Sequence, residues 1–519
     1  MMDKNNLALI AKEEYANPDN AVRRGGLGGN PFWNVRATRF MFCPSFDFTP
    51  ILACNDYLYA ATDAEGKTHE FRATTTTELL TPIWNDIAVG QVQLFVYALD
   101  KNGEKIATVG ARTFYKAAPF TADYPAAACD YRTCAKRAYE YGFSLPIIQL
   151  WADKDAVPSG YELYLYIAKM NSAVVRSMLN YAKLSPENKE AALNIAINAA
   201  NYLIKVSEPE GSPLEGLPPT YHNPEKRTDF YAGISADAKK REKENMLLYP
   251  SNAGNAYLAL YEEVGDKKYF DAAMKIANYY LNNVCENGTW WQLVSTETGE
   301  PTSTAYCVPH TICDFLYKVY SVTGEEKWKT LADNAINYLR GNCLKSFHWE
   351  GQFEDAPVSV QYSNMTHFSA SAIIRDIAQN RSDDEKEIAT AEELMRYVED
   401  QFVVWSDPMK YTTQNYDASI WHLPAGLEQY NWYVPIDSST ASIMNSFKAM
   451  HSITKKPLYL AKAKALADSI TRAQNEENGL IPTHWITPDY KETGGDLWIN
   501  CMFGTANFLF AFADYLDKQ

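Results

Sequence analysis

Long apolar runs are missing from this sequence, since none reaches the roughly 18 residues that a membrane-spanning helix needs. The first twenty residues, MMDKNNLALIAKEEYANPDN, also lack a basic stretch followed by an apolar core, so no signal peptide is visible. We therefore expect a soluble protein. It is cytoplasmic on the sequence as given, and periplasmic if a signal peptide was removed.

An excess of basic residues is absent as well. The chain has 64 acidic and 48 basic residues, which gives a formal net charge of −16. A nucleic-acid partner requires a basic stripe to meet its phosphates, and none is present. We expect no nucleic-acid partner, and the sequence makes no prediction of oligomeric state.

Metal and nucleotide motifs are missing too. The nine cysteines are scattered singly, and neither CxxC, HExxH nor an Asp-rich calcium loop occurs. The glycine-rich segment at 25–30 has no strand before it and no helix after it, so it predicts a flexible lead-in. We expect no metal and no cofactor, with mostly reduced cysteines, although a disulfide between two of them stays open.

The sequence changes character near residue 120. Short alternating segments separated by Asp/Asn-Gly turns predict an N-terminal all-β sandwich, similar to a fibronectin type III or immunoglobulin module. We assign residues 1–29 to a lead-in, 30–117 to this module, 118–132 to a Pro/Ala-rich linker and 133–519 to a helical domain. The module is expected to be accessory.

A pair of helices recurs about every 60 residues in the helical domain. Apolar spacing at i, i+3, i+4 and i+7 places first helices near 161–182, 252–264, 309–322, 366–380, 440–453 and 500–517. Second helices follow near 187–206, 267–284, 325–341, 386–401 and 457–474, with short turns at Gly265, Gly324 and Lys455. A single pair cannot bury its own apolar faces, so the repeat predicts an array.

Six first helices and five second helices predict a closed ring. A short helix near 133–141 would be the missing sixth partner and would join the start of the chain to its end. The expected architecture is an (α/α)6 toroid with the first helices inside, and the alternative is an open solenoid.

The long loops of such a toroid all leave at one end. They carry eight of the twelve tryptophans, together with several histidines and carboxylates. Flat aromatic faces beside carboxylates suit pyranose rings, whose C–H groups stack while their hydroxyls bind charged acceptors. Six inner-helix N-termini at the same end would favour an anionic group such as a uronate carboxylate.

The repeats and the segment PIDSSTASIMNSF at 435–447 resemble the six-hairpin glycosidase superfamily, and more distantly the unsaturated glucuronyl hydrolases within it. The resemblance covers residues 130–519 and implies action on a carbohydrate, without fixing the sugar or the reaction. The β module departs from the pattern, because those hydrolases are usually a bare toroid.

Glycoside hydrolysis uses one carboxylic acid and one carboxylate. The predicted loops offer Glu350, Glu354, Asp355, Glu428, Asp437 and Asp496. We select Glu354 or Asp355 as one catalytic group and Asp437 as the other, with Glu350 as a further candidate. Asp437 also stands where an N-cap would. Candidate sugar contacts are Trp349, Trp421, Trp432, Trp485, Trp498, Tyr430, Asp496, His310, His367 and His422.

Two other readings of the same residues remain open. A polysaccharide lyase or uronate epimerase would use a Tyr or His base, and the lyase also an Asn, Arg or His that neutralises the uronate carboxylate. For these roles the sequence offers Tyr249, Asn252, Tyr306, His310, Asn364, His367, His422 and Tyr430. A glycan-binding protein without catalysis would bind the sugar with no turnover. The prediction carried forward is a hydrolase of an acidic oligosaccharide or polysaccharide.

Overall fold

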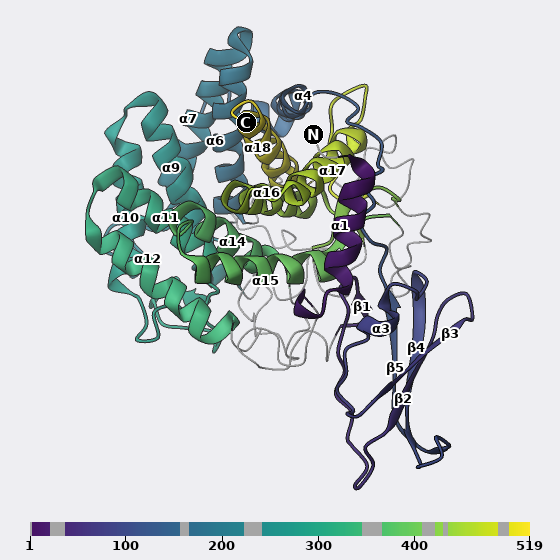
Figure 1. Ribbon diagram of the computed structural model, residues 1–519. Helices are drawn as coiled ribbons and strands as arrows, with labels where there is room; N and C mark the ends of the chain where they lie inside the picture. The colour runs from purple at the N-terminus through teal and green to yellow at the C-terminus, as the bar shows by residue number, and fades with distance from the viewer. Residues whose placement is uncertain are drawn as a thin grey trace.

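The computed structural model of the chain describes residues 3–20, 37–155, 166–222, 241–344, 366–406, 421–428, 434–485 and 498–519. Six of its helices form an inner ring (Figure 1). Each inner helix packs on the next, and the last packs on the first, so the ring is closed and the open solenoid is ruled out. In ring order they are α6 (Ile167–Leu184), α9 (Pro250–Val264), α11 (His310–Thr323), α14 (Phe368–Asn380), α16 (Asp437–Thr454) and α18 (Ile499–Leu516).

Each inner helix packs against one outer helix. In the same order the outer helices are α7 (Lys189–Val206), α10 (Lys267–Asn282), α12 (Glu326–Tyr338), α15 (Glu385–Phe402), α17 (Pro457–Ala473) and α4 (Tyr131–Ser144). The sixth pair joins α18, at the end of the chain, to α4, which precedes all the others. The predicted helix near 133–141 is therefore present and closes the ring.

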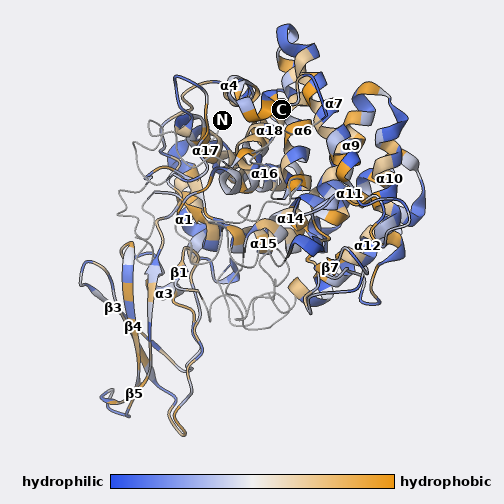
Figure 2. Ribbon diagram, turned by 180° about the vertical axis from the view of Figure 1, so that it is seen from behind, coloured by the Kyte–Doolittle hydropathy of each residue, from blue (hydrophilic) through white to orange (hydrophobic). Residues whose placement is uncertain are grey.

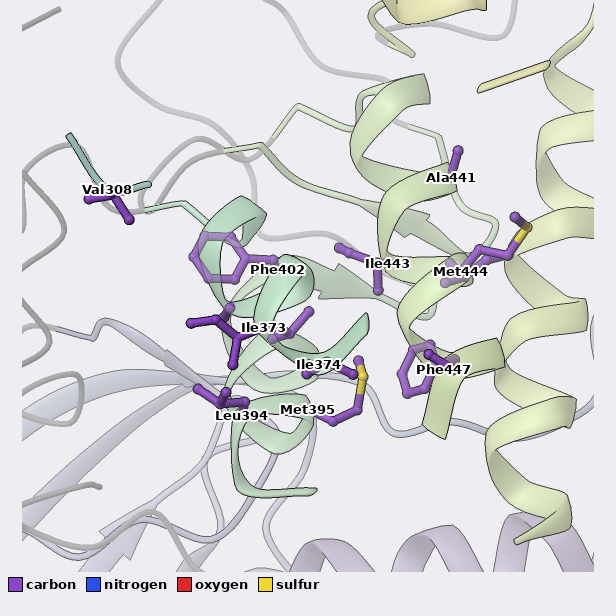
Figure 3. Packing of buried hydrophobic residues seen from close by; sticks show 14 of the residues in the cluster. Val308, Ile373, Ile374, Leu394, Met395, Phe402, Ala441, Ile443, Met444 and Phe447 are labelled. Atoms are coloured by element: carbon purple, nitrogen blue, oxygen red, sulfur yellow. The ribbon is translucent and has the colours of Figure 1, made fainter. Parts of the chain in front are cut away.

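The helices form where their apolar residues have a surface to bury. The outer helix α10 buries Tyr269, Ala273, Ile276, Ala277 and Tyr280, which recur at helical spacing on one face. Figure 2 shows the outer helices α10 and α12 with both hydrophilic and hydrophobic stretches. Apolar side chains of α14, α15 and α16, including Ile374, Met395 and Phe447, point toward one another between the two layers (Figure 3).

The N-terminal strands differ from the predicted sandwich. The described strands between residues 39 and 116 form one five-stranded sheet in the order β1-β5-β4-β2-β3. The strands are β1 (Arg39–Phe40), β2 (Tyr57–Thr62), β3 (Thr68–Ala73), β4 (Gly90–Leu99) and β5 (Lys105–Lys116). All pairs are antiparallel except β1 with β5.

The buried face of this sheet is covered by a coil and by the short helix α3 (Thr81–Trp84), where a sandwich would have a second sheet. Phe46 of the coil lies 5.5 Å from Phe114 of β5, and Trp84 of α3 lies 6.1 Å from the same ring. Large aromatic side chains thus fill the second layer. Alternating apolar residues predicted the strands correctly, but they do not specify what covers the sheet.

The segment assigned to the lead-in contains a helix. Residues Lys4–Ala16 form α1, which packs on the outer helix α17 between the ring and the sheet (Figure 1). The Tyr15 hydroxyl donates a hydrogen bond of 2.5 Å to Glu399, whose carboxylate also lies 2.7 Å from the ammonium of Lys462. This buried set fixes α1 to the ring.

The sheet is attached to the ring through β1. The side chain of Arg39 donates hydrogen bonds to backbone carbonyls at the end of α15. The carboxylate of Asp400 in turn accepts the backbone N–H groups of Met41, at 2.6 Å, and Phe42, at 2.8 Å. No helix in the described part of the chain has both the length and the apolar character needed to cross a bilayer.

Candidate functional site

The end of the ring where the inner helices begin is called the mouth below. The inner and outer helices of a pair run antiparallel, so each outer helix ends where the inner helices begin. The connection from an outer helix to the next inner helix therefore lies at the mouth. Short strands pair at this end. β6 (Glu244–Met246), in the connection that leads into α9, pairs with β7 (Leu293–Ser295), in the connection that leads into α11. β8 (Val403–Val404) pairs with β9 (Ala425–Gly426) within the connection that leads into α16. The mouth is thus held by backbone hydrogen bonds between segments far apart in sequence.

A cavity of about 270 Å³ opens among the inner helices. Its walls come from α6, α9, α11, α14 and α18. Aromatic side chains, Tyr249 and Phe368, line it together with polar groups from several helices. A concave site with aromatic walls and a few convergent polar groups is the usual form of a small-molecule pocket. The polar and cationic lining residues are Lys169, Ser172, Arg176, Asn252, His310, Thr311, Asn500 and Asn507.

Lys169, in the first turn of α6, lines the cavity near the mouth and lies close to two aromatic rings. Its ammonium is 5.7 Å from the ring centroid of Tyr166 and 5.5 Å from that of Tyr249. The two tyrosine rings meet edge to face at 5.6 Å. Cation–π contacts of this kind hold a lysine in place without neutralising its charge, so the ammonium keeps the capacity to bind an anion.

His310 is the first residue of α11 and lines the cavity. Burial, with a smaller effect of Arg375, lowers the pKa of His310 to about 4, so the imidazole is neutral near pH 7. Its Nδ1 lies 3.0 Å from the carbonyl oxygen of Val308. Because a carbonyl only accepts, Nδ1 carries the proton and Nε2 keeps a lone pair. His310 can therefore act as a base or accept a hydroxyl.

His367 precedes α14 and is fully buried. Burial and Arg375 lower the pKa of His367 to about 3. Its Nδ1 lies 3.1 Å from the Ser371 hydroxyl, while Nε2 is buried without a hydrogen-bond partner. The ring also packs against Phe368 and Phe402. The structure places His367 behind the wall of the cavity, so direct contact with a sugar does not fit this position.

Asp437 is the first residue of α16 and is fully buried. The N-cap position belongs to Ile436 and has no side-chain cap, so the N-cap explanation for Asp437 does not hold. Its carboxylate accepts the Ser438 backbone N–H at 2.6 Å and the Thr505 hydroxyl of α18 at 3.2 Å. Thr505 is adjacent to Gly504, which lines the cavity, so Asp437 lies just behind the cavity wall.

The environment favours the protonated form of this carboxyl. Burial raises the pKa of Asp437 well above its usual range, and the nearby charge of Glu428 raises it further, against the smaller opposite effect of its hydrogen bonds. A carboxyl whose pKa is raised by burial is typical of a general acid. Because the side chain has no exposed surface, contact with a substrate requires local opening at the mouth.

Three charged side chains of the inner helices were missed by sequence reasoning. They are Arg176 of α6, Asp314 of α11 and Arg375 of α14, and Asp314 interacts electrostatically with each of the two arginines. Burial raises the pKa of Asp314 to about 6, although Arg375 and Arg176 act in the opposite direction. The signal was present in the sequence, since charged residues interrupt helices predicted to be apolar on nearly every face.

Most of the tryptophans that the structure describes at this end are buried. Trp290, Trp405 and Trp485 have no exposed surface, and Trp421 is 8% exposed. Trp421 and Trp485 pack together with ring centroids 5.0 Å apart. A buried indole offers no face to a sugar, so we remove Trp421 and Trp485 from the sugar-binding set. They seal the connections over the core.

Two predicted contacts remain on the surface. Trp498, just before α18, is 42% exposed, and His422 is also exposed. Neither lines the cavity. The other predicted site residues lie outside the described residues: Trp349, Glu350, Glu354, Asp355, Tyr430, Trp432 and Asp496. In the described ranges, no group of three or more His, Cys, Asp or Glu side chains is placed to hold a metal ion.

Comparison with known proteins finds similarity in structure but not in sequence. No protein-family model and no curated protein matches the chain. Among solved structures, cellobiose 2-epimerase from Spirochaeta thermophila DSM 6192 superposes with a TM-score of 0.50 at 12% identity, over 74% of this chain and 98% of that one.

Two further structures match at lower TM-scores. A family 76 glycoside hydrolase from a bovine Bacteroides thetaiotaomicron strain has a TM-score of 0.48 at 12% identity, over 89% of this chain and 93% of that one. An unsaturated glucuronyl hydrolase specific for heparin has a TM-score of 0.46 at 10% identity, over 75% and 98% of the two chains. At these identities the comparison shows the fold alone: the helical part of the chain is an (α/α)6 toroid.

Proposed function

We propose that the chain is a carbohydrate-active enzyme that hydrolyses a glycosidic bond in an acidic, uronate-containing oligosaccharide or polysaccharide at the mouth of the toroid. The observation that carries the proposal is the fully buried carboxyl of Asp437, whose pKa is raised by burial and by the nearby Glu428, next to a cavity with aromatic and polar walls. The toroid shared with cellobiose 2-epimerase supports a sugar as the class of ligand.

In this proposal Asp437 is the general acid. A carboxylic acid that stays protonated near pH 7 can donate its proton to the leaving oxygen as the glycosidic bond breaks. A second carboxylate, Glu354 or Asp355, activates the attacking water or attacks the sugar itself. Both of these residues lie outside the described residues, so their roles rest on the sequence. Tyr249 and His310 contact the sugar in the cavity.

Epimerisation of the sugar is the second candidate. It requires a base that removes a proton from carbon, and the neutral His310 with a free Nε2 lone pair on the cavity wall fits that role. Proton exchange with solvent separates the two reactions. An epimerase incorporates deuterium from D₂O into the sugar without cleaving it, whereas a hydrolase releases new reducing ends.

The test is a screen of uronate-containing and neutral glycans, in which reducing ends and the near-ultraviolet absorbance of an unsaturated product are measured together. On any substrate that is cleaved, we expect Asp437→Asn to lower kcat by about 10²- to 10⁴-fold, as loss of a general acid does. Glu354→Gln or Asp355→Asn should have an effect of similar size. Full activity in all three variants would show that the assignment is wrong.

A thermal-stability measurement distinguishes lost chemistry from lost folding. In the unfolded chain Asp437 ionises near pH 4, whereas burial raises its pKa in the folded protein, so its contribution to stability falls as the pH rises above 4. Asp437→Asn should therefore raise the Tm at pH 7, with a smaller gain near pH 4. Asp384→Asn is the matched control, because Asp384 caps α15 at the opposite end of the ring. It should keep full activity.

A further inference from the structure

We propose that Arg176, Arg375 and Lys448, on the inner wall of the ring below the mouth, form a binding site for the anionic group of a sugar. This inference rests on the proposed function and extends it, because it assigns the acidic group of the substrate to named residues. It also predicts which end of a glycan enters the ring. These three residues, together with Asp314, are called the inner-wall cluster.

The cluster lies inside the ring at the depth of the cavity floor. Arg176 and Asn507 line the cavity and lie roughly 12 to 14 Å along their helices from the mouth, at 1.5 Å per residue. Arg176 is on α6 and Arg375 is on α14, three positions apart in a ring of six helices. The two guanidinium groups therefore approach the ring axis from opposite sides, and Asp314 of α11 lies within the electrostatic reach of both.

The positive charges of this cluster are not neutralised by the protein. No ion pair or hydrogen bond within the described residues involves the guanidinium of Arg176, and its remaining electrostatic partners are Tyr139 and Asp314. Arg375 donates long hydrogen bonds to the hydroxyls of Ser442, at 3.3 Å, and Ser446, at 3.4 Å, and its guanidinium lies 5.8 Å from the ring centroid of Phe508, so none of these contacts neutralises its charge. Two guanidinium groups this poorly paired have donors available for a ligand.

The remaining members add to the imbalance. Burial and Arg375 lower the pKa of Lys448 to about 8, so it is still mostly charged at pH 7. Asp314, with a pKa of about 6, is the one carboxylate of the cluster, and it makes no ion pair with either arginine. With Lys169 near the mouth, four cations face one carboxylate. This is the reverse of the whole chain, whose net charge is −16.

A bound anion would neutralise the excess positive charge of the inner-wall cluster. Cations in a cavity with low-dielectric walls concentrate an oppositely charged ligand, and guanidinium groups fit carboxylate and phosphate oxygens two at a time. The shared chemistry is therefore a sugar that carries one anionic group, either a carboxylate or a phosphate ester. Asp314 would accept hydroxyl groups of the same ring.

The size of the cavity limits how the sugar binds. A volume of about 270 Å³ lies just below the roughly 300–1,000 Å³ that ligand pockets span, so it accommodates a sugar unit and not a continuous chain. With the anionic group at the floor, the scissile bond of that sugar faces the mouth, where Asp437 lies. The acidic sugar is then the terminal residue of the substrate, and the enzyme acts from a chain end.

Isothermal titration calorimetry of the full chain with D-glucuronate, D-glucose 6-phosphate and D-glucose tests the proposal. We expect at least one of the two anionic sugars to bind about ten-fold or more tightly than glucose, as a charge-assisted contact provides. The stronger of the two identifies the group as carboxylate or phosphate. Equal affinity for all three sugars, or no binding of any of them, would overturn the proposal.

Variants assign the preference to the cluster. Arg176→Gln should remove most of the preference for the anionic sugar while leaving the affinity for glucose unchanged, and Arg176→Lys should restore part of it. Lys183→Gln, an exposed change on the same helix, is the control and should have no effect. An equal loss of affinity for charged and neutral sugars in a folded Arg176→Gln variant would contradict the proposal.

The outcome is independent of catalysis. If an anionic sugar binds with an Arg176-dependent preference but no glycan is cleaved, the proposed hydrolase activity fails and the binding site stands. If a glycan is cleaved and Arg176→Gln leaves the discrimination between acidic and neutral substrates unchanged, the hydrolase stands and the binding site fails.

Discussion

The two ends of the ring are built in different ways. At the end opposite the mouth, inner and outer helices are joined by short turns, and three of these turns place one residue in the left-handed region: Gly265 with φ +72°, Gly324 with φ +70° and Lys455 with φ +56°. In each case the backbone N–H of that residue donates to the carbonyl four residues earlier. This is the usual C-terminal cap of a helix, and it depends only on neighbouring residues.

The mouth depends on contacts between distant segments instead. The backbone N–H of Asp437 donates to the carbonyl of Thr483 at 3.0 Å, and that of Ile436 donates to Gly426 at 2.9 Å. Two connections, the one that leads into α16 and the one that leads into α18, thus meet at the beginning of α16. The mouth also holds buried ionisable groups, Asp437 and His367, whose pKa values lie far from their ordinary range. The turns at one end depend on neighbouring residues, while the other end holds buried polar groups that depend on contacts between distant segments.

The largest effect should come from disturbing the mouth at Gly426. A Cβ atom at this position would lie 2.7 Å from the backbone nitrogen of Thr440 and 2.8 Å from the carbonyl carbon of Ser439. Because the obstacle is backbone of the first turn of α16, it cannot rotate aside. We expect Gly426→Ala to lower the free energy of unfolding by about 3 kcal/mol, measured by urea denaturation.

The control for this variant is Gly341→Ala. Nothing lies within 4 Å of a Cβ atom at Gly341, and its φ is negative, so the change should be within about 0.5 kcal/mol of neutral. Activity on the identified substrate should fall in Gly426→Ala even below its unfolding midpoint, since Asp437 moves with the first turn. Equal stability of the two variants would show that the mouth tolerates a shift of α16 and is not rigidly built.

The same contrast explains what sequence reasoning could and could not reach. The helix pairs, their turns at Gly265, Gly324 and Lys455, and the closing pair of α18 with α4 follow from periodicity and from local capping signals. Strands β3, β4 and β5 also follow from alternation. The single sheet and the docking of α1 do not, because they depend on which distant surface covers an apolar face.

The site was harder to predict for a related reason. Sequence reasoning searched the long connections and expected their tryptophans to be exposed, but Trp290, Trp405 and Trp485 are fully buried. An indole in a long loop fills space whenever a segment must cover a core. Charges that face the cavity come instead from inside the inner helices. Arg176 and Asp314 interrupt apolar runs of the inner helices. A charged residue within such a run indicates the site better than the aromatic and polar content of the long loops does.

Acid sensitivity gives a second test of the mouth. The unfolded chain binds a proton at His367 below pH 6.5, whereas the folded protein binds it only near pH 3. The unfolded state therefore holds more protons between these values, and stability is present above pH 6.5 and lost as the pH falls toward 3. At pH 5 this loss amounts to about 2 kcal/mol. His367→Gln should reduce the difference in unfolding free energy between pH 7 and pH 5 by that amount.

Ser371→Ala is the matched variant for this measurement. It removes the hydrogen bond to Nδ1 of His367 but keeps the titrating ring in its buried position. We expect it to lower stability at both pH values and to leave the difference between them close to that of the wild type. If His367→Gln kept the full acid sensitivity, the imidazole would have to be accessible to solvent, and the mouth would be less tightly packed than the structure indicates.

The smallest effect should come from the turns at the opposite end, where only one residue's conformation is involved. Gly265 has φ +72° and no atom within 4 Å of a Cβ position, so Gly265→Ala should cost about 1 kcal/mol, the strain of a left-handed L-residue. Lys455 has the equivalent conformation at the α16 turn. Lys455→Gly should relieve that strain, and the greater freedom of glycine in the unfolded chain leaves a net gain of about 0.5 kcal/mol. Urea denaturation measures both changes in the free energy of unfolding, which should have opposite signs. If both variants also keep full activity, this end of the ring contributes only to folding. A loss of activity in either variant would contradict the separation of the two ends.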